Sequence, residues 1–130
     1  MMKTDITDRE DIHLLVSVFY QKLLADESIS YLFTDVAKIK LEEHLDVLVD
    51  FWETILLNTG SYQKNVMALH LKLHQQSPLQ PHHFKTWLSF FHASVNELFD
   101  GPNAEMARQR ATGIATVMQI KMAELYKDEI

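Results

Sequence analysis

The feature that most constrains this sequence is how rarely the chain is interrupted. Its 130 residues include only three glycines and three prolines, at Gly60, Gly101, Gly113, Pro78, Pro81 and Pro102. These residues disfavour helix interiors most strongly, and they leave long stretches between them. Apolar residues in those stretches recur at helical spacing, and no segment alternates every second residue as a half-buried strand does. The pattern predicts an all-α fold.

Breaks and apolar periodicity together place the helices. Long helices are expected at residues 8–25, 37–57, 62–74, 82–99 and 103–127, with a short apolar element at 28–33 that packs inward. Pro81 stands where a proline suits the first helical turn. The sequence contains no internal repeat and no linker, and its length suits one compact core. We therefore expect a single domain over residues 1–130.

The ends and faces of these helices can be predicted in part. Thr7 and Glu10 are spaced as in a capping box, in which each side chain satisfies a free backbone N–H of the first turn. The adjacent pair His82–His83 opens a helix and is expected at the surface. The residues expected to face the core from the helices at 37–57 and 103–127 are Leu41, His44, Leu48, Phe51, Trp52, Ile55, Met106, Ala107, Ala111, Ile114, Val117, Met118, Met122 and Leu125.

Composition excludes several classes of function. The formal net charge is −6, which argues against a nucleic-acid module because such a module needs a basic face to neutralise phosphates. No apolar run approaches the roughly 20 residues that span a bilayer, and the polar start of the chain lacks the apolar core of a signal peptide. The absence of cysteine removes disulfides, thiolate metal sites and thioether haem attachment. We expect a protein of the reduced cytoplasm without a membrane partner.

Histidines and aromatic residues are the candidates for chemistry, because motifs of hydrolases and nucleotide-binding proteins are absent. His70 and His74 are four residues apart, a spacing that can chelate a metal on one helix face or simply place two polar residues near a helix C-terminus. His44 lies on an apolar face and needs a partner or a polar cavity. Tyr20 and Trp87 also carry polar groups on apolar faces. Burial in the core is the leading interpretation of these three from spacing alone.

The order of these residues along the chain adds a further indication. The stretches concerned are Val18-Phe19-Tyr20, Tyr31-Leu32-Phe33, Glu43-His44-Leu45 with Phe51-Trp52, His70-Leu71-Lys72-Leu73-His74 with Pro78-Leu79, His83-Phe84-Lys85-Thr86-Trp87-Leu88, and Glu97-Leu98-Phe99-Asp100-Gly101. In this order they resemble a truncated haemoglobin over nearly the whole chain. The sequence has no Gly-Gly pair, and in this respect it resembles group III of that family. The resemblance implies a two-on-two helical sandwich that holds haem between its distal and proximal helices.

The resemblance also implies roles for single residues. His74 matches the proximal histidine that binds the haem iron, and His70, one turn earlier, is the competing assignment. Tyr20, His44 and Trp87 match the polar residues of the distal pocket that stabilise a bound gas. His44 is also compatible with gating the pocket or binding the iron itself. The residues implied in binding haem b are Phe33, His44, Leu48, Trp52, Phe84 and Trp87, with Phe33 packed on the porphyrin plane.

Three functions follow as hypotheses. The first is reversible binding or transport of O₂ or another diatomic gas, such as NO or CO, at a His-ligated haem iron. The second is an enzyme that oxidises nitric oxide or handles peroxide, with electrons from an unidentified reductase. The third is a haem-free helical sensor or interaction module in which the histidines and tryptophans belong to the core. Uptake of haem separates the third hypothesis from the first two.

Overall fold

A computed structural model describes residues 3–58 and 66–128, and these residues are almost entirely helical. The elements are α1 (Arg9–Ala25), α2 (Glu27–Tyr31), the π-helical turn η1 (Leu32–Val36), α3 (Leu41–Leu57), α4 (Val66–Gln76), α5 (Pro81–Leu98) and α6 (Pro102–Asp128). Within the two described ranges there is no strand. The all-α prediction is confirmed. The start of the helix expected at 62–74 lies outside the described residues.

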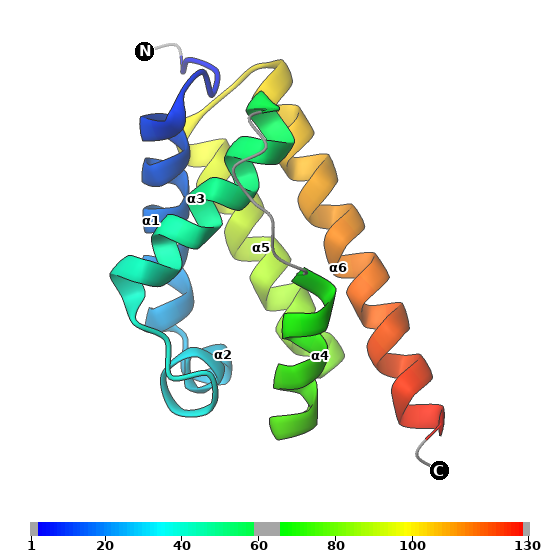
Figure 1. Cartoon of the computed structure of the whole chain (residues 1–130). Coiled ribbons are helices and arrows are strands. Elements are labelled where there is room, and N and C mark those ends of the chain that lie inside the picture. Colours follow the sequence, from blue (N-terminus) through cyan, green and yellow to red (C-terminus); the bar gives the residue numbers. More distant parts are fainter. Residues whose placement is uncertain (1–2, 59–65, 129–130) are drawn as a thin grey trace.

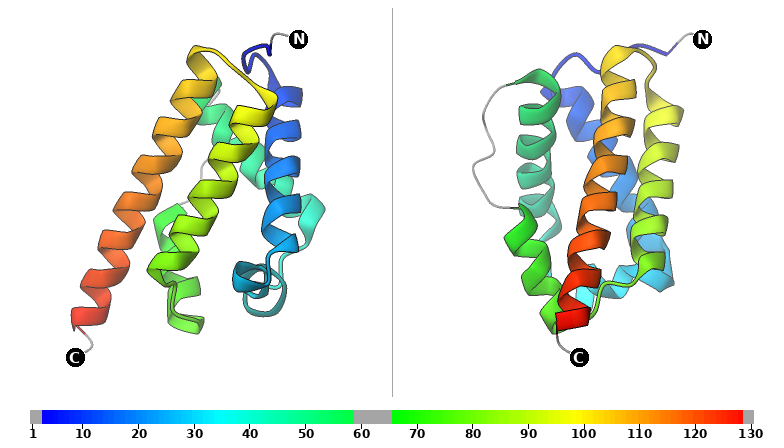
Figure 2. Two further views of the ribbon diagram at one scale, coloured as in Figure 1. Left: turned by 180° about the vertical axis from the view of Figure 1, so that it is seen from behind. Right: turned by 90° about the vertical axis from the view of Figure 1, so that its right-hand side faces the viewer.

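Four long helices form two antiparallel pairs that pack across each other. α1 pairs with α3 and α5 pairs with α6, while α1 also contacts α5 and α3 also contacts α6 (Figure 1). The two further views show α3 and α4 on one side of the molecule and α5 with α6 on the other (Figure 2). This arrangement is the expected two-on-two helical sandwich. Among the described residues, no helix is long and apolar enough to cross a membrane.

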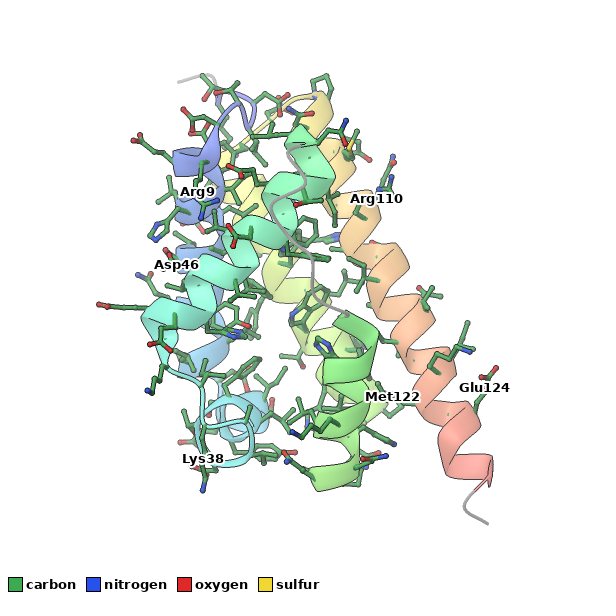
Figure 3. All side chains as sticks on the ribbon, viewed as in Figure 1. Arg9, Lys38, Asp46, Arg110, Met122 and Glu124 are labelled. Carbon is green, nitrogen blue, oxygen red and sulfur yellow. The ribbon has the colours of Figure 1, made fainter. Side chains whose placement is uncertain are left out.

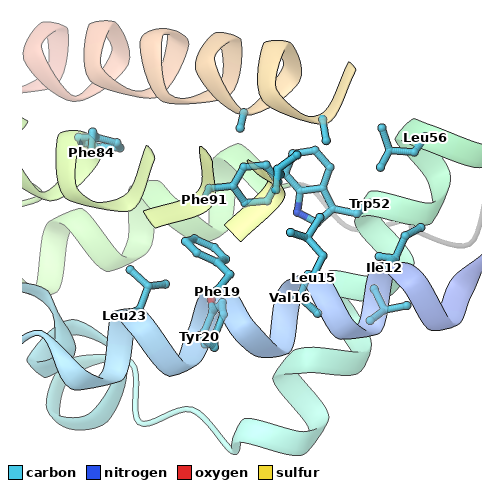
Figure 4. Packing of buried hydrophobic residues seen from close by; sticks show 14 of the residues in the cluster. Ile12, Leu15, Val16, Phe19, Tyr20, Leu23, Trp52, Leu56, Phe84 and Phe91 are labelled. Carbon is cyan, nitrogen blue, oxygen red and sulfur yellow. The ribbon is translucent and has the colours of Figure 1, made fainter. Parts of the chain in front are cut away.

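An aromatic stack occupies the centre of the sandwich. The ring of Phe91 on α5 stacks on Trp52 of α3 at 4.7 Å and on Trp87 at 5.8 Å, and it meets Phe19 of α1 edge-on at 5.2 Å. Figure 4 shows Phe19, Trp52 and Phe91 converging between their helices. Offset and edge-on arrangements of this kind add to the free energy of apolar burial. The stack therefore joins three of the four long helices.

The cap of α1 lies one residue later than the sequence predicted. Asp8, not Thr7, is the N-cap, and its carboxylate accepts from the backbone N–H of Asp11 at 2.9 Å. The carboxylate of Asp11 in turn accepts from the backbone N–H and the hydroxyl of Thr7. Asp11, rather than Glu10, therefore reaches back toward the start of the helix, and it bonds the residue before the cap instead of the cap itself.

Two predicted faces also need correction. α3 begins at Leu41 rather than at residue 37, because the chain passes through Lys38 with a left-handed φ of 51°. Leu41 is 41% exposed, and on α6 Met106 and Val117 are 38% and 50% exposed. α6 instead packs through a narrower stripe of Ala104, Ala107, Ala111, Ala115, Met118 and Met122. Alanine allows close approach to α5, so one stripe suffices and the opposite face of α6 stays outside.

The N-terminal segment closes the top of the bundle. The carboxylate of Asp5 accepts hydrogen bonds from the backbone N–H groups of Ile6, Asn103 and Ala104. Burial alone would raise the pKa of Asp5, but these three donors lower it. Gly101 permits the contact, since its φ is 142° and a Cβ there would lie 2.5 Å from Asp5 Cγ. Asp5 thus caps α6 from the other end of the chain.

Candidate functional site

A tyrosine from α1 and a histidine from α3 meet inside the sandwich. The Tyr20 hydroxyl lies 2.6 Å from His44 Nε2, although the residues are 24 positions apart. Tyr20 is 4% exposed, and burial raises its pKa well above the ordinary value. Burial, and then the charge of His70 on α4, lower the pKa of His44. Both groups therefore stay uncharged near neutral pH.

Phe33 completes what we call the tyrosine–histidine cluster: Tyr20, Phe33 and His44. The centroid of its ring lies 5.3 Å from that of the Tyr20 ring, at an interplanar angle of 69°, and the Tyr20 and His44 ring centroids are 5.2 Å apart. Phe33 belongs to η1, whose wider turn follows directly on α2. π-helical turns of this kind occur often at functional sites. Three elements thus bring three of the predicted site residues into contact.

Trp87 lies beyond the cluster on α5. Phe19 connects the two, because its ring meets Tyr20 at 5.5 Å and Trp87 at 5.6 Å. No described residue accepts a hydrogen bond from the Trp87 indole N–H. The described residues also contain no buried side-chain nitrogen or oxygen without a partner, so solvent can reach this N–H. Trp87 therefore has an N–H donor without a described partner, and one aromatic ring separates it from the cluster.

His74 lies in the last turn of α4. Its Nδ1 accepts a hydrogen bond from the backbone N–H of Leu79 at 2.9 Å, which ties the helix end to the loop before α5. No described residue pairs with its Nε2, and the half-buried ring leaves that nitrogen open to a ligand. His70 lies one turn earlier, near His44. Within the described residues, no group of three His, Asp or Glu side chains could hold a metal ion.

The remaining predicted lining residues differ in depth. Trp52 and Phe84 are 2% and 8% exposed and belong to the continuous core, where Trp52 stacks on Phe91. Leu48, like Phe33, is half-buried and packs against that core. Trp52 and Phe84 are therefore more deeply buried than Leu48 and Phe33.

Sequence reasoning missed one buried polar pair. His83 is 3% exposed, contrary to the expected surface position, and its Nε2 lies 2.9 Å from the Tyr31 hydroxyl. Its Nδ1 accepts from the backbone N–H of Gln80 at the start of α5, so the neutral ring donates from Nε2. Its place three residues after the N-cap was the only signal in the sequence. The pair fastens α2 to α5 and lies outside the cluster.

A surface cleft lies on the outer side of His44. Its volume is about 350 Å³ and its lining residues are Lys38, Ile39, Lys40, Glu43, His44 and Val47. The cleft begins at the loop between η1 and α3, where Lys38 is labelled in Figure 3. His44 is the member of the tyrosine–histidine cluster that lines this cleft.

The two-on-two helical sandwich is the fold of a small globin, and the comparisons identify its family. The sequence matches the bacterial-like globin family over residues 4–122. It is 29% identical over 121 residues to the group 3 truncated hemoglobin ctb of Campylobacter jejuni, which covers 91% of this chain and 93% of that protein. The crystal structure of a group III truncated hemoglobin from Campylobacter jejuni agrees with a TM-score of 0.81 and 27% identity, covering 93% and 95% of the two chains.

The chain belongs to the bacterial-like globin family. The resemblance to truncated haemoglobins seen in the sequence is confirmed. Membership in this family supports haem-based binding of diatomic gases such as O₂ as the general function of the chain. The chemistry of the described residues fits a haem group, because His74 Nε2 on α4 has no described partner and the tyrosine–histidine cluster supplies a polar hydrogen.

Proposed function

We propose that this chain holds haem b through His74 and reversibly binds O₂ or a related diatomic gas on the side of the tyrosine–histidine cluster. The observation that carries the proposal is the 2.6 Å contact between the Tyr20 hydroxyl and His44 Nε2. The pair brings a hydroxyl and an imidazole nitrogen together inside the sandwich, where these groups can hydrogen-bond a small polar ligand.

Non-covalent haem suits the composition. The chain has no cysteine, so thioether attachment is excluded and the cofactor is held by ligation and packing. His74 supplies the ligating Nε2 and Phe33 packs on the porphyrin plane. Leu48, Trp52, Phe84 and Trp87 line the pocket at their different depths. When bound, haem would supply an iron atom that His74 holds and that can bind a diatomic gas.

The proton of Tyr20 decides what the cluster can donate. Tyr20 has a single O–H, and it cannot donate to His44 and to a gas at once. When neutral His44 carries its proton on Nε2, it donates to the Tyr20 oxygen and leaves the Tyr20 O–H for the gas. The indole N–H of Trp87 is a second donor beside the Tyr20 O–H, and both donors stabilise a ligand that gains negative charge. The tautomer of His44 therefore sets the strength of gas binding.

Oxidation of nitric oxide is the second candidate function. Two donors directed at one ligand favour slow release of O₂, which suits redox chemistry better than delivery. The reaction converts NO, O₂ and one electron to nitrate, and the electron comes from an unidentified reductase. Peroxide chemistry would need the same donors. Mixing the O₂-loaded protein with nitric oxide and measuring nitrate tests this candidate, and the absence of nitrate excludes it.

The test of haem ligation uses two histidines of one helix. We expect the full chain, expressed with haem, to show an intense Soret band. His74→Gly should lower haem affinity at least about 100-fold, and added imidazole should restore the spectrum because it replaces the lost ligand. The matched control is His70→Gly, one turn earlier on α4.

Two results would contradict the proposal. Loss of ligation in His70→Gly with His74→Gly unaffected would move the ligand to His70. A folded chain that takes up no haem would support the haem-free helical module instead.

A further inference from the structure

Two consecutive backbone N–H groups in the loop before α5 bond to two different histidines. The N–H of Leu79 donates to Nδ1 of His74 at 2.9 Å, and the N–H of Gln80 donates to Nδ1 of His83 at 2.9 Å. His74 lies in the last turn of α4, and His83 lies in the first turn of α5. An imidazole nitrogen from each helix therefore holds the loop that joins them.

Each of these bonds fixes where the proton of its histidine lies. A ring nitrogen that accepts a hydrogen bond has no proton of its own, so the neutral imidazole carries its proton on Nε2. In His83 this Nε2 lies 2.9 Å from the Tyr31 hydroxyl oxygen, which can accept the bond. In His74 the proton lies on the same nitrogen that the proposed function assigns to the iron. The shared arrangement thus suits His83 and conflicts with ligation by His74.

Ligation reverses the proton requirement at His74. A metal binds the lone pair of a deprotonated imidazole nitrogen, so the Nε2 proton must leave and the neutral ring then carries its proton on Nδ1. One proton passes to solvent and another is taken from it, so the charge of the ring does not change. The Nδ1–H and the Leu79 N–H would then be two donors facing each other, with no acceptor between them. The Leu79 bond and iron ligation therefore exclude each other.

The neighbouring contacts confine the required change to one peptide group. On one side, the Ser77 N–H bonds a carbonyl in the last turn of α4 at 2.9 Å. On the other side, Gln80 is bonded to His83, which is only 3% exposed. The peptide that joins Pro78 to Leu79 lies between these two fixed points. Rotation about the ψ bond of Pro78 and the φ bond of Leu79 turns this peptide while both neighbours keep their contacts.

We propose, on the basis of the ligation by His74 proposed above, that the peptide between Pro78 and Leu79 turns when His74 binds iron. The Leu79 N–H leaves Nδ1, and the carbonyl oxygen of Pro78 takes its place and accepts a hydrogen bond from Nδ1–H. Histidines that bind metals generally donate their second ring N–H to such an acceptor, which fixes the ring and raises the basicity of the ligand. The peptide thereby couples haem uptake to the loop that leads into α5.

Scalar couplings across hydrogen bonds report both histidine contacts in one sample. The full chain, labelled with ¹⁵N, is measured without haem and with ferrous haem carrying CO, which is diamagnetic. We expect a coupling between the Leu79 nitrogen and His74 Nδ1 only without haem, and one between the Gln80 nitrogen and His83 Nδ1 in both samples. In the loaded chain the Leu79 amide should also exchange with solvent at least about tenfold faster than the Gln80 amide. The loaded sample is sufficient by itself, because it contains both contacts.

Removal of one N–H measures how strongly the Leu79 bond opposes haem uptake. Exchange of Leu79 for its α-hydroxy acid, by chemical synthesis of the chain, replaces the N–H by an oxygen atom and keeps the side chain. Haem affinity should rise about threefold to tenfold, because no hydrogen bond has to be given up. The same exchange at Gln80 is the matched control, since it removes the bond to His83 and should not raise haem affinity.

The results also separate this proposal from the proposed function. A Leu79 coupling that persists in the loaded chain overturns the turning of the peptide. If His74→Gly then abolishes ligation, His74 is still the iron ligand and the proposed function stands. If His74→Gly leaves ligation intact, the assignment of His74 is wrong as well. Loss of the coupling between Gln80 and His83 on loading, or an equal effect of the two hydroxy acids, also overturns the proposal.

Discussion

The two sides of the candidate haem site are built by different kinds of contact. On one side, the tyrosine–histidine cluster joins α1, η1 and α3 through residues far apart in the chain, with Tyr20 and His44 24 positions apart. On the other side, His74 is tied to Leu79, five positions away, and α4 packs chiefly on α6. The first side is set by tertiary packing and the second by local contacts.

This difference indicates on which side of the candidate site the side chains are held in place before the cofactor binds. The cluster is backed by the aromatic stack of Phe19, Trp52, Trp87 and Phe91, so its donors are held before any ligand arrives. The His74 ring is placed mainly by a single backbone N–H. Binding of haem would therefore order the α4 side more than the cluster side, and stability should be distributed unequally between them.

The largest expected effect is on the free energy of unfolding. Phe91→Ala removes the ring shared by Phe19, Trp52 and Trp87, and we expect a loss of about 3–5 kcal/mol. Leu73→Ala, at a half-buried position on α4, should cost less than about 2 kcal/mol because part of the side chain already meets solvent. Urea denaturation of both variants measures the difference. Equal losses would break the comparison of the two sides.

An intermediate effect is expected on gas release. Tyr20→Phe removes the hydroxyl of the cluster and should speed O₂ dissociation about 10- to 100-fold, equivalent to a hydrogen bond of about 1.5–3 kcal/mol. Tyr31→Phe is the matched control, because that hydroxyl bonds His83 outside the cluster. Stopped-flow measurement of the O₂ dissociation rate of both variants tests this expectation. An equal acceleration in both would remove Tyr20 from the gas-binding site.

The smallest effect concerns pH. Burial, and then His70, lower the pKa of His44, while burial, and then His82, lower that of His83. The unfolded chain then binds protons more tightly, so the free energy of unfolding falls as pH falls through the ordinary value of 6.5. Each histidine contributes at most about 1.4 kcal/mol per pH unit. Below the lowered pKa values this dependence ends.

The variant that isolates one of these histidines is His83→Asn. Its side-chain oxygen can still accept from the Gln80 N–H, but it does not titrate. Denaturation between pH 5 and pH 8 should show a shallower slope for this variant. An unchanged slope in His83→Asn would assign the pH dependence elsewhere.

Much of the fold could be predicted because it depends on local patterns. Rare Gly and Pro with apolar residues at helical spacing predicted the all-α class, and the bounds of α1, α5 and α6 agree within one residue at every end. The errors came where two local choices compete. Asp8 displaced Thr7 as a cap, and the left-handed Lys38 delayed α3. His83 was wrongly predicted to be exposed, because no sequence pattern shows that its ring pairs with Tyr31.

The sequence by itself determined the helices, the family resemblance and the residue types of the candidate site, since spacing and order along the chain carry that information. Only the tertiary structure decided which polar groups meet. The contacts of Tyr20 with His44, of His83 with Tyr31 and of Asp5 with α6 all join distant segments. The physical reason is that a helix fixes the face on which a side chain lies, whereas packing between helices decides which side chain it touches.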